Sequence, residues 1–174
     1  MTDPDPEYET FPQLMQVQLP GVQILADPRH TVKLDSAPKA ALWRRRTLQV
    51  LRTLSAYVQA KHAARADGRP AGADLATLFS FVRSQQPGAL ISMRGVAPRE
   101  SDAVVNTPRL AAHRYFPVPP EVDPTGTLMY VAHIAIGSGR NLAPRLYFHD
   151  DTDGPTGQLY VGYIGPHLPN THTS

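Results

Sequence analysis

The sequence contains no cysteine among its 174 residues. Without thiols, the chain can form no disulfide, no thiolate metal site and no cysteine nucleophile. It also lacks any run of about 18 consecutive apolar residues, so we expect no membrane-spanning helix. Residues 1–7 are acidic and rich in proline, whereas a signal peptide needs a basic start and an apolar core. We therefore expect a cytoplasmic protein that does not associate with a membrane.

Charge is sparse as well, at 18% of residues, and the formal net charge is only +2. This balance is too weak to indicate nucleic-acid binding from total charge. The hydrophobic fraction of 41% is sufficient for a globular core, and the length suits one ordinary domain rather than two. The 18 prolines are about double the usual share of roughly 5%. One globular domain is therefore expected.

Helical periodicity is clearest in residues 40–65, which contain neither glycine nor proline. A single apolar stripe at three- and four-residue spacing predicts a long amphipathic helix there. A shorter helix is predicted over residues 74–85 from the same spacing. The two stripes consist of Trp43, Thr47, Val50, Leu51, Leu54, Tyr57 and Val58, and of Leu75, Leu78, Phe79 and Val82.

Strand patterns surround these helices. Residues 1–12 are predicted to be a flexible N-terminal tail. Apolar and polar residues then alternate over 14–19, which predicts a strand, and residues 22–24 are the candidate second arm of a hairpin. Two further short strands are predicted, at 31–34 and at 89–93, the latter buried.

The C-terminal third, residues 128–168, contains three short apolar runs joined by turns rich in glycine, proline and aspartate. The runs cover residues 128–136, 146–149 and 159–164. Adjacent strands joined by short turns form an antiparallel meander. Both faces carry apolar residues, so the long helix is the natural cover for one face. We therefore predict a single α+β domain over residues 13–174, an antiparallel β-sheet with a C-terminal three-stranded meander packed against one long and one shorter α-helix.

Histidines are the first candidate catalytic residues, because the imidazole pKa lies near neutrality. His133 belongs to the first run of the meander, His149 ends the second and His167 follows the third. Since neighbouring strands lie about 4.8 Å apart, residues on one face can converge. Three imidazoles could hold zinc, and two could act as acid and base in RNA cleavage. Their spacing matches no metal motif, so we assign no metal site and no cofactor; the alternative is sheet-edge histidines bonded to water or backbone.

Arginines are the second candidates, for binding phosphate or nucleic acid. Arg140 and Arg145 flank the first turn of the meander, and Arg114 precedes it. If they share a face, they form a phosphate-binding patch that total charge conceals, and tyrosines such as Tyr163 could stack bases beside it. The alternative is a solvated surface with the tyrosines packed in the core. It is favoured, because only basic stripes that stand out from their background count as nucleic-acid footprints.

Two stretches near the C-terminus, residues 143–151 (APRLYFHDD) and 160–171 (YVGYIGPHLPNT), form a distinctive pattern. The pattern resembles the C-terminal end of uncharacterised bacterial proteins, mostly actinobacterial, which have no family name. The resemblance covers the last quarter of the chain and implies a recurring module. Some such modules occur in multi-gene bacterial conflict and stress systems. The resemblance implies no catalytic residue.

Two functional hypotheses follow. The first is a non-catalytic protein-interaction module of a bacterial regulatory, stress or defence complex, whose partner is a protein encoded nearby. The second is a metal-independent ribonuclease or nucleic-acid-directed toxin. In the second, His133, His149 and His167 act as acid and base, Arg145 holds the phosphate and Tyr163 is a further candidate. Convergence of His133, His149 and Arg145 on one point favours catalysis, and their dispersal disfavours it.

Overall fold

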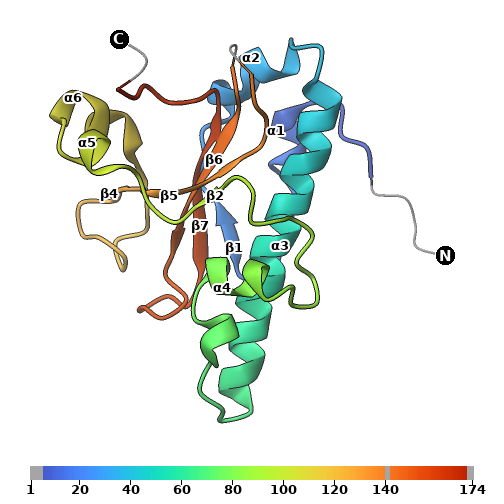
Figure 1. Ribbon diagram of the computed structural model, residues 1–174, viewed down its shortest axis with the longest axis vertical. Helices are drawn as coiled ribbons and strands as arrows, with labels where there is room; N and C mark the ends of the chain where they lie inside the picture. Colours follow the sequence, from blue (N-terminus) through green and yellow to red (C-terminus); the bar gives the residue numbers. More distant parts are fainter. Residues whose placement is uncertain (1–5, 140–141, 172–174) are drawn as a thin grey trace.

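The computed structural model describes residues 6–139 and 142–171. A five-stranded sheet lies against one long helix in a mixed α+β arrangement (Figure 1). The strands are β1 (Val22–Ile24), β2 (Val96–Ala97), β3 (Tyr115–Pro117), β4 (Thr127–Met129), β5 (Ala132–Ala135), β6 (Arg145–Asp150) and β7 (Leu159–Gly165). The helices are α1 (Phe11–Leu14), α2 (Val32–Asp35), α3 (Ala40–Ala66), α4 (Leu78–Arg83), α5 (Asp102–Val105) and α6 (Pro108–Ala111), with 3-10 turns η1 (Pro28–Thr31), η2 (Ala73–Leu75) and η3 (Ala112–Arg114).

The large sheet has the strand order β1-β7-β6-β5-β2. Antiparallel pairing joins β7 to β6, β6 to β5 and β5 to β2, whereas β1 runs parallel to β7. Strands β3 and β4 form a separate two-stranded ribbon. The predicted α+β class and the mostly antiparallel sheet are therefore confirmed. The first strand of the chain, however, joins the last strand, and the predicted N-terminal hairpin is reduced to one antiparallel bridge between Leu19 and Val22.

Helix α3 confirms the predicted long helix and covers one face of the sheet (Figure 1). Its apolar stripe is buried, and Leu51, Leu54 and Val58 have no exposed surface. They belong to one core cluster with Phe148 of β6 and Ile164 of β7. Fully burying one such side chain contributes about 1.5–3 kcal/mol to the free energy of folding, so the packing of α3 on this face of the sheet stabilises the domain. Among the helices that the structure describes, none is long and apolar enough to cross a membrane.

The opposite face carries a cluster of tyrosines, which we call the tyrosine face. Pairing between β6 and β7 becomes irregular after Tyr147, which lies opposite Tyr163, and Gly162 is left without a partner. A Cβ atom on Gly162 would lie 2.5 Å from the ring of Tyr130, so glycine alone permits this approach. The buried residues of this face are Phe116, Val118, Tyr130, Tyr147, Tyr160, Tyr163 and Leu168.

The N-terminal part differs from the sequence prediction. The predicted tail, residues 1–12, runs into α1, where Phe11 is fully buried and its N–H donates to the carboxylate of Asp35 at 3.0 Å. The hydroxyl of Thr10 caps α1. This cap explains why residues 14–19 begin as helix and turn, although their alternation predicted a strand. The part of the predicted tail before residue 6 lies outside the described residues.

Two further predicted strands are also wrong. Residues 31–34 lie in η1 and α2; the carboxylate of Asp27 caps η1 at Pro28, and α2 continues directly from it. Residues 89–93 form a loop. The N–H of Leu90 donates to the hydroxyl of Thr53 on α3 at 3.0 Å, so it is not available to a neighbouring strand.

Two longer predicted elements are interrupted, one by a local helix cap and the other by a contact between distant segments. The predicted helix over 74–85 is divided into η2 and α4 at Thr77, whose hydroxyl caps α4. The predicted first strand of the meander, residues 128–136, is divided into β4 and β5. At the division, the N–H of Tyr130 donates to the carbonyl of Arg114 at 2.8 Å. The C-terminal sheet is therefore joined to the segment that precedes the ribbon.

Candidate functional site

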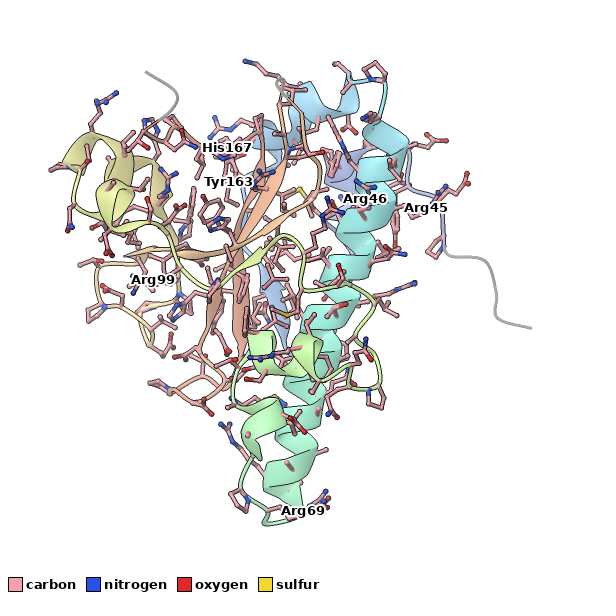
Figure 2. The ribbon with its side chains drawn as sticks, in the orientation of Figure 1. Arg45, Arg46, Arg69, Arg99, Tyr163 and His167 are labelled. Atoms are coloured by element: carbon pink, nitrogen blue, oxygen red, sulfur yellow. The ribbon has the colours of Figure 1, made fainter. Side chains whose placement is uncertain are left out.

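A small polar hollow of about 220 Å³ opens beside the tyrosine face. Strand β5 supplies His133 and β6 supplies Tyr147, while His167 follows β7 and lies near the upper end of the sheet in Figure 2. The loop before α5 contributes Glu100, and η3 contributes Arg114. Segments far apart in the sequence therefore meet at this site, which we call the His133 hollow.

A buried ion pair forms part of the wall of the His133 hollow. Arg114 Nε donates to Glu100 Oε1 at 2.7 Å, and the two side chains are only 1% and 8% exposed. Arg114 Nη1 also donates to the carbonyls of Leu110 at 2.9 Å and Pro169 at 2.8 Å. The hydroxyl of Tyr147 donates to the same carboxylate oxygen. Because a buried charge must keep its partner, this network holds four chain segments in place around the hollow.

Burial and hydrogen bonding shift the pKa values of three of these groups. Burial alone would raise the pKa of Glu100, but hydrogen bonds from Tyr147 and Arg114 outweigh it and lower that pKa. Burial, together with the same carboxylate, raises the pKa of the Tyr147 hydroxyl. Burial lowers the pKa of His167. Near pH 7 the hollow therefore contains a charged carboxylate, a neutral phenol and a neutral His167 imidazole.

Both histidines of the hollow are held through the same ring nitrogen. His133 Nδ1 lies 3.0 Å from the carbonyl of Val131, and His167 Nδ1 lies 2.6 Å from the carbonyl of Leu168. A carbonyl oxygen only accepts hydrogen bonds, so each Nδ1 carries a hydrogen. In a neutral ring the free electron pair is then on Nε2, which in His167 lies 3.5 Å from Nδ2 of Asn170. Nε2 is therefore the atom of each ring that can exchange a proton with a ligand.

His149 does not reach the hollow. His133 lies opposite Tyr147 in the ladder, and His149 is two positions further along β6, a displacement of about 6.6 Å. Its ring instead packs against Tyr130, with the ring centroids 6.1 Å apart. Burial lowers the pKa of His149. This histidine is therefore part of the packing of the tyrosine face.

Arg145 and Tyr163 also have structural partners. Arg145 Nη1 donates to the carbonyl of Gly137 at 2.8 Å and to that of Ala143 at 2.9 Å, which fixes the segment before β6. The hydroxyl of Tyr163 donates to the carbonyl of Pro166 at 2.5 Å. His133, His149 and Arg145 therefore do not converge on one point, which disfavours catalysis by that set of residues.

Of the predicted site residues, the structure brings together His133, His167 and Arg114. Arg140 lies outside the described residues. Sequence reasoning missed Glu100, because its partner is 14 residues away in a segment without periodicity, where no spacing rule marks the pair. Glu100 lies between Arg99 and Asp102 in the sequence, so nothing local distinguishes it from a surface charge.

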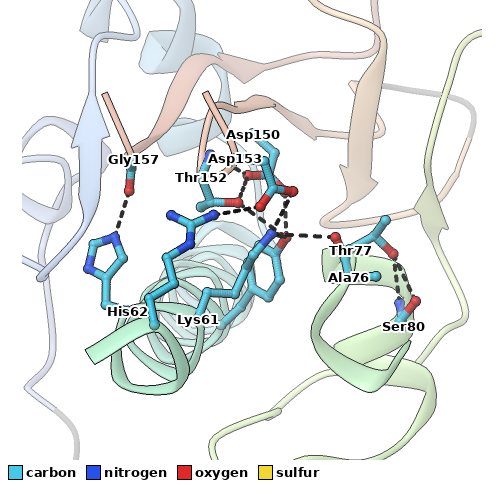
Figure 3. A network of polar contacts seen from close by, with 11 residues as sticks. Lys61, His62, Ala76, Thr77, Ser80, Asp150, Thr152, Asp153 and Gly157 are labelled. Carbon is cyan, nitrogen blue, oxygen red and sulfur yellow. Dashed lines mark hydrogen bonds and ion pairs between the residues drawn. The ribbon is translucent and has the colours of Figure 1, made fainter. Parts of the chain in front are cut away.

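A second polar cluster, around Lys61, is structural (Figure 3). The Lys61 side chain has no exposed surface; its Nζ donates to one oxygen of Asp153 at 2.8 Å, and Arg65 donates to the other at 2.6 Å. The hydroxyl of Tyr57 donates to Asp150 at 2.6 Å. These charged groups and hydroxyls form their ion pairs and hydrogen bonds with one another. The cluster therefore fastens α3 to the turn between β6 and β7.

Within residues 6–139 and 142–171, no three histidine, aspartate or glutamate side chains gather as ligands for a metal ion. No protein-family model matches the chain, and no curated protein or solved structure matches it either. The His133 hollow is therefore the feature from which a function must be inferred.

Proposed function

We propose that the protein cleaves RNA by metal-independent acid–base catalysis in the His133 hollow. The observation that carries this proposal is that two imidazoles from different elements line one hollow, each with Nδ1 held by a backbone carbonyl, while Nε2 of His167 has a long contact of 3.5 Å with Asn170. Histidine is suited to general acid–base catalysis near neutral pH. RNA suits such a pair, because its 2′-hydroxyl is a nucleophile within the substrate.

His167 acts as the base and His133 as the acid. The lowered pKa keeps His167 neutral, so its Nε2 accepts the proton of the 2′-hydroxyl while that oxygen attacks phosphorus. The bond between phosphorus and the 5′-oxygen breaks, and the protonated form of His133 donates its Nε2 proton to the leaving oxygen. The carboxylate of Glu100 lies 3.8 Å from His133 Nδ1 and 2.7 Å from Arg114 Nε, so its charge is shared between them. The products are a 2′,3′-cyclic phosphate and a 5′-hydroxyl.

The size and charge of the hollow limit what it can hold. Its volume of about 220 Å³ is below the range of about 300–1,000 Å³ that is usual for ligand pockets. It therefore takes the scissile phosphate and a ribose, while the bases lie outside. Arg114 lines the hollow, but its charge is balanced by Glu100, so its main role is to position that carboxylate. We accordingly expect little sequence preference.

The experiment is the cleavage of single-stranded RNA by the purified protein and three variants. His133→Gln and His167→Gln are each expected to slow cleavage by about 100-fold or more. His149→Gln is the matched control, since His149 lies in the same sheet but outside the hollow, and it should cleave at nearly the wild-type rate. Thermal unfolding verifies that each variant is folded. Intact RNA with folded wild-type protein, or equal losses in all three variants, would show the proposal to be wrong.

The first hypothesis, a non-catalytic interaction module of a regulatory, stress or defence complex, stays a prediction. Large exposed apolar side chains include Val32, Leu90 and Tyr115, at 60%, 51% and 54% exposure, and these three lie on separate elements. Single exposed apolar residues are common and mark no docking surface. Native copurification with a protein encoded nearby would support this hypothesis, and its absence would count against it.

A further inference from the structure

A groove runs along the first half of α3, on the side of the sheet opposite the tyrosine face. One hollow, of about 530 Å³, is lined by Arg46 and Gln49 of α3 and by Ser92 and Arg94 of the loop before β2. A second hollow, of about 600 Å³, adjoins the first, because Ser138 lines both. We call the two hollows together the basic groove.

Among the described residues, no carboxylate neutralises the cations that line the basic groove. Its second hollow adds Lys33 of α2 and Lys39, just before α3, to Arg46 and Arg94. In the part of the chain that the structure describes, no aspartate or glutamate lines either hollow, and none of the four cations forms an ion pair. The neighbouring Arg44, by contrast, has a carboxylate 2.8 Å away. The groove is therefore a region of positive potential that the low total charge hides.

The spacing of the cations suits a chain of phosphates. Lys39 and Arg46 are seven residues apart, which places them on the same side of α3 about 10 Å apart along its axis. About three phosphates of a stacked strand cover that span. Arg46 Nη1 donates to the carbonyl of Ile136 at 3.3 Å, which turns the side chain toward the sheet edge. Figure 2 shows Arg46 and Arg45 on different sides of α3, so only the former faces the groove.

We propose that the basic groove binds the sugar–phosphate backbone of a single-stranded nucleic acid. Its cations neutralise phosphates, and the hydroxyls of Ser92 and Ser138 and the carboxamide of Gln49 donate to phosphate oxygens. The volume of each hollow lies within the usual range for ligand pockets. This proposal goes beyond the cleavage chemistry and does not require it, because the groove and the His133 hollow lie on opposite sides of the sheet.

The test measures binding of a fluorescein-labelled single-stranded DNA of about 12 nucleotides, a length in the range that single-strand-binding domains cover. DNA lacks the 2′-hydroxyl, so the proposed cleavage cannot interfere. The groove variant carries Arg46→Gln and Arg94→Gln. The matched control carries Arg69→Gln and Arg83→Gln, which remove the same charge away from the groove; Arg69 lies at the far end of α3 from Arg46 in Figure 2.

Salt dependence gives the expected size of the effect. For single strands, each phosphate contact contributes about 0.7 to the slope of log affinity against log salt. Four contacts predict a wild-type slope of about −2.8, and the groove variant a slope of about −1.4 with affinity about 25-fold lower in about 0.1 M salt. The control should keep the wild-type slope. Equal losses in both variants, or an unchanged slope in the groove variant, would overturn the proposal.

Competition distinguishes a strand from an isolated phosphate. Unlabelled oligonucleotide is expected to displace the labelled DNA, and adenosine monophosphate at the same phosphate concentration is not. Displacement by the mononucleotide would overturn backbone binding. The variant His167→Gln should bind the DNA as the wild type does, so a failure of the cleavage proposal would leave this result unchanged.

Discussion

Replacing Glu100 with alanine leaves a buried guanidinium without its carboxylate. Arg114 is only 1% exposed and would keep only its bonds to the carbonyls of Leu110 and Pro169. The hydroxyl of Tyr147 would lose its acceptor as well. Removing one partner of a buried ion pair costs about 3–5 kcal/mol. We therefore expect Glu100→Ala to lower the free energy of unfolding by about 4 kcal/mol.

Urea unfolding at pH 7, followed by far-UV circular dichroism, measures this loss. Thermal unfolding provides a second measurement. In a domain of this size a loss of 1 kcal/mol lowers Tm by about 2–4 °C, so Tm should fall by about 8–16 °C. Glu121→Ala removes an exposed carboxylate and should change stability by less than about 0.5 kcal/mol. Replacing both partners, by Glu100→Leu with Arg114→Met, should recover most of the loss. A loss below about 1 kcal/mol in Glu100→Ala would refute the burial of this pair.

Three further outcomes are expected. Because the folded-state pKa of Glu100 is depressed, its contribution to stability is complete above the unfolded-state pKa of about 4.3 and is lost as pH falls through the folded-state value. Urea unfolding between about pH 3 and pH 7 should therefore show the difference between wild type and Glu100→Gln shrinking toward low pH. Gly162→Ala should cost about 1–3 kcal/mol, since its Cβ would meet the Tyr130 ring, whereas Gly72→Ala, which meets nothing within 4 Å, should be nearly neutral by thermal unfolding. Thr77→Ala should cost about 1 kcal/mol in the same assay by removing the cap of α4.

The long helix was predictable because its signal is local and repeated. The stripe from Trp43 to Val58 recurs over several turns, so no single contact can override it. Thr10 and Thr77 show the opposite case. One hydroxyl that caps a helix decides where the element begins. At Thr10 it outweighs a short alternating pattern, and at Thr77 it divides a longer helical one. Short strands and helix boundaries were therefore predicted wrongly.

From the sequence, the candidate site was predictable only for residue types whose side chain suggests catalysis by itself. Imidazoles are conspicuous, so His133 and His167 could be chosen from the sequence. Excluding His149 required the register of β5 against β6, which no local pattern specifies. The partnership of Glu100 with Arg114 joins irregular segments, and only tertiary packing brings them together.

Product analysis of a short RNA tests most directly whether His167 acts as base and His133 as acid in one hollow. Mass spectrometry after incubation with the wild-type protein should detect a 2′,3′-cyclic phosphate and a 5′-hydroxyl, and the His167→Gln protein should form them about 100-fold more slowly. Intact RNA, products that carry a 5′-phosphate, or undiminished cleavage by His167→Gln would contradict this mechanism.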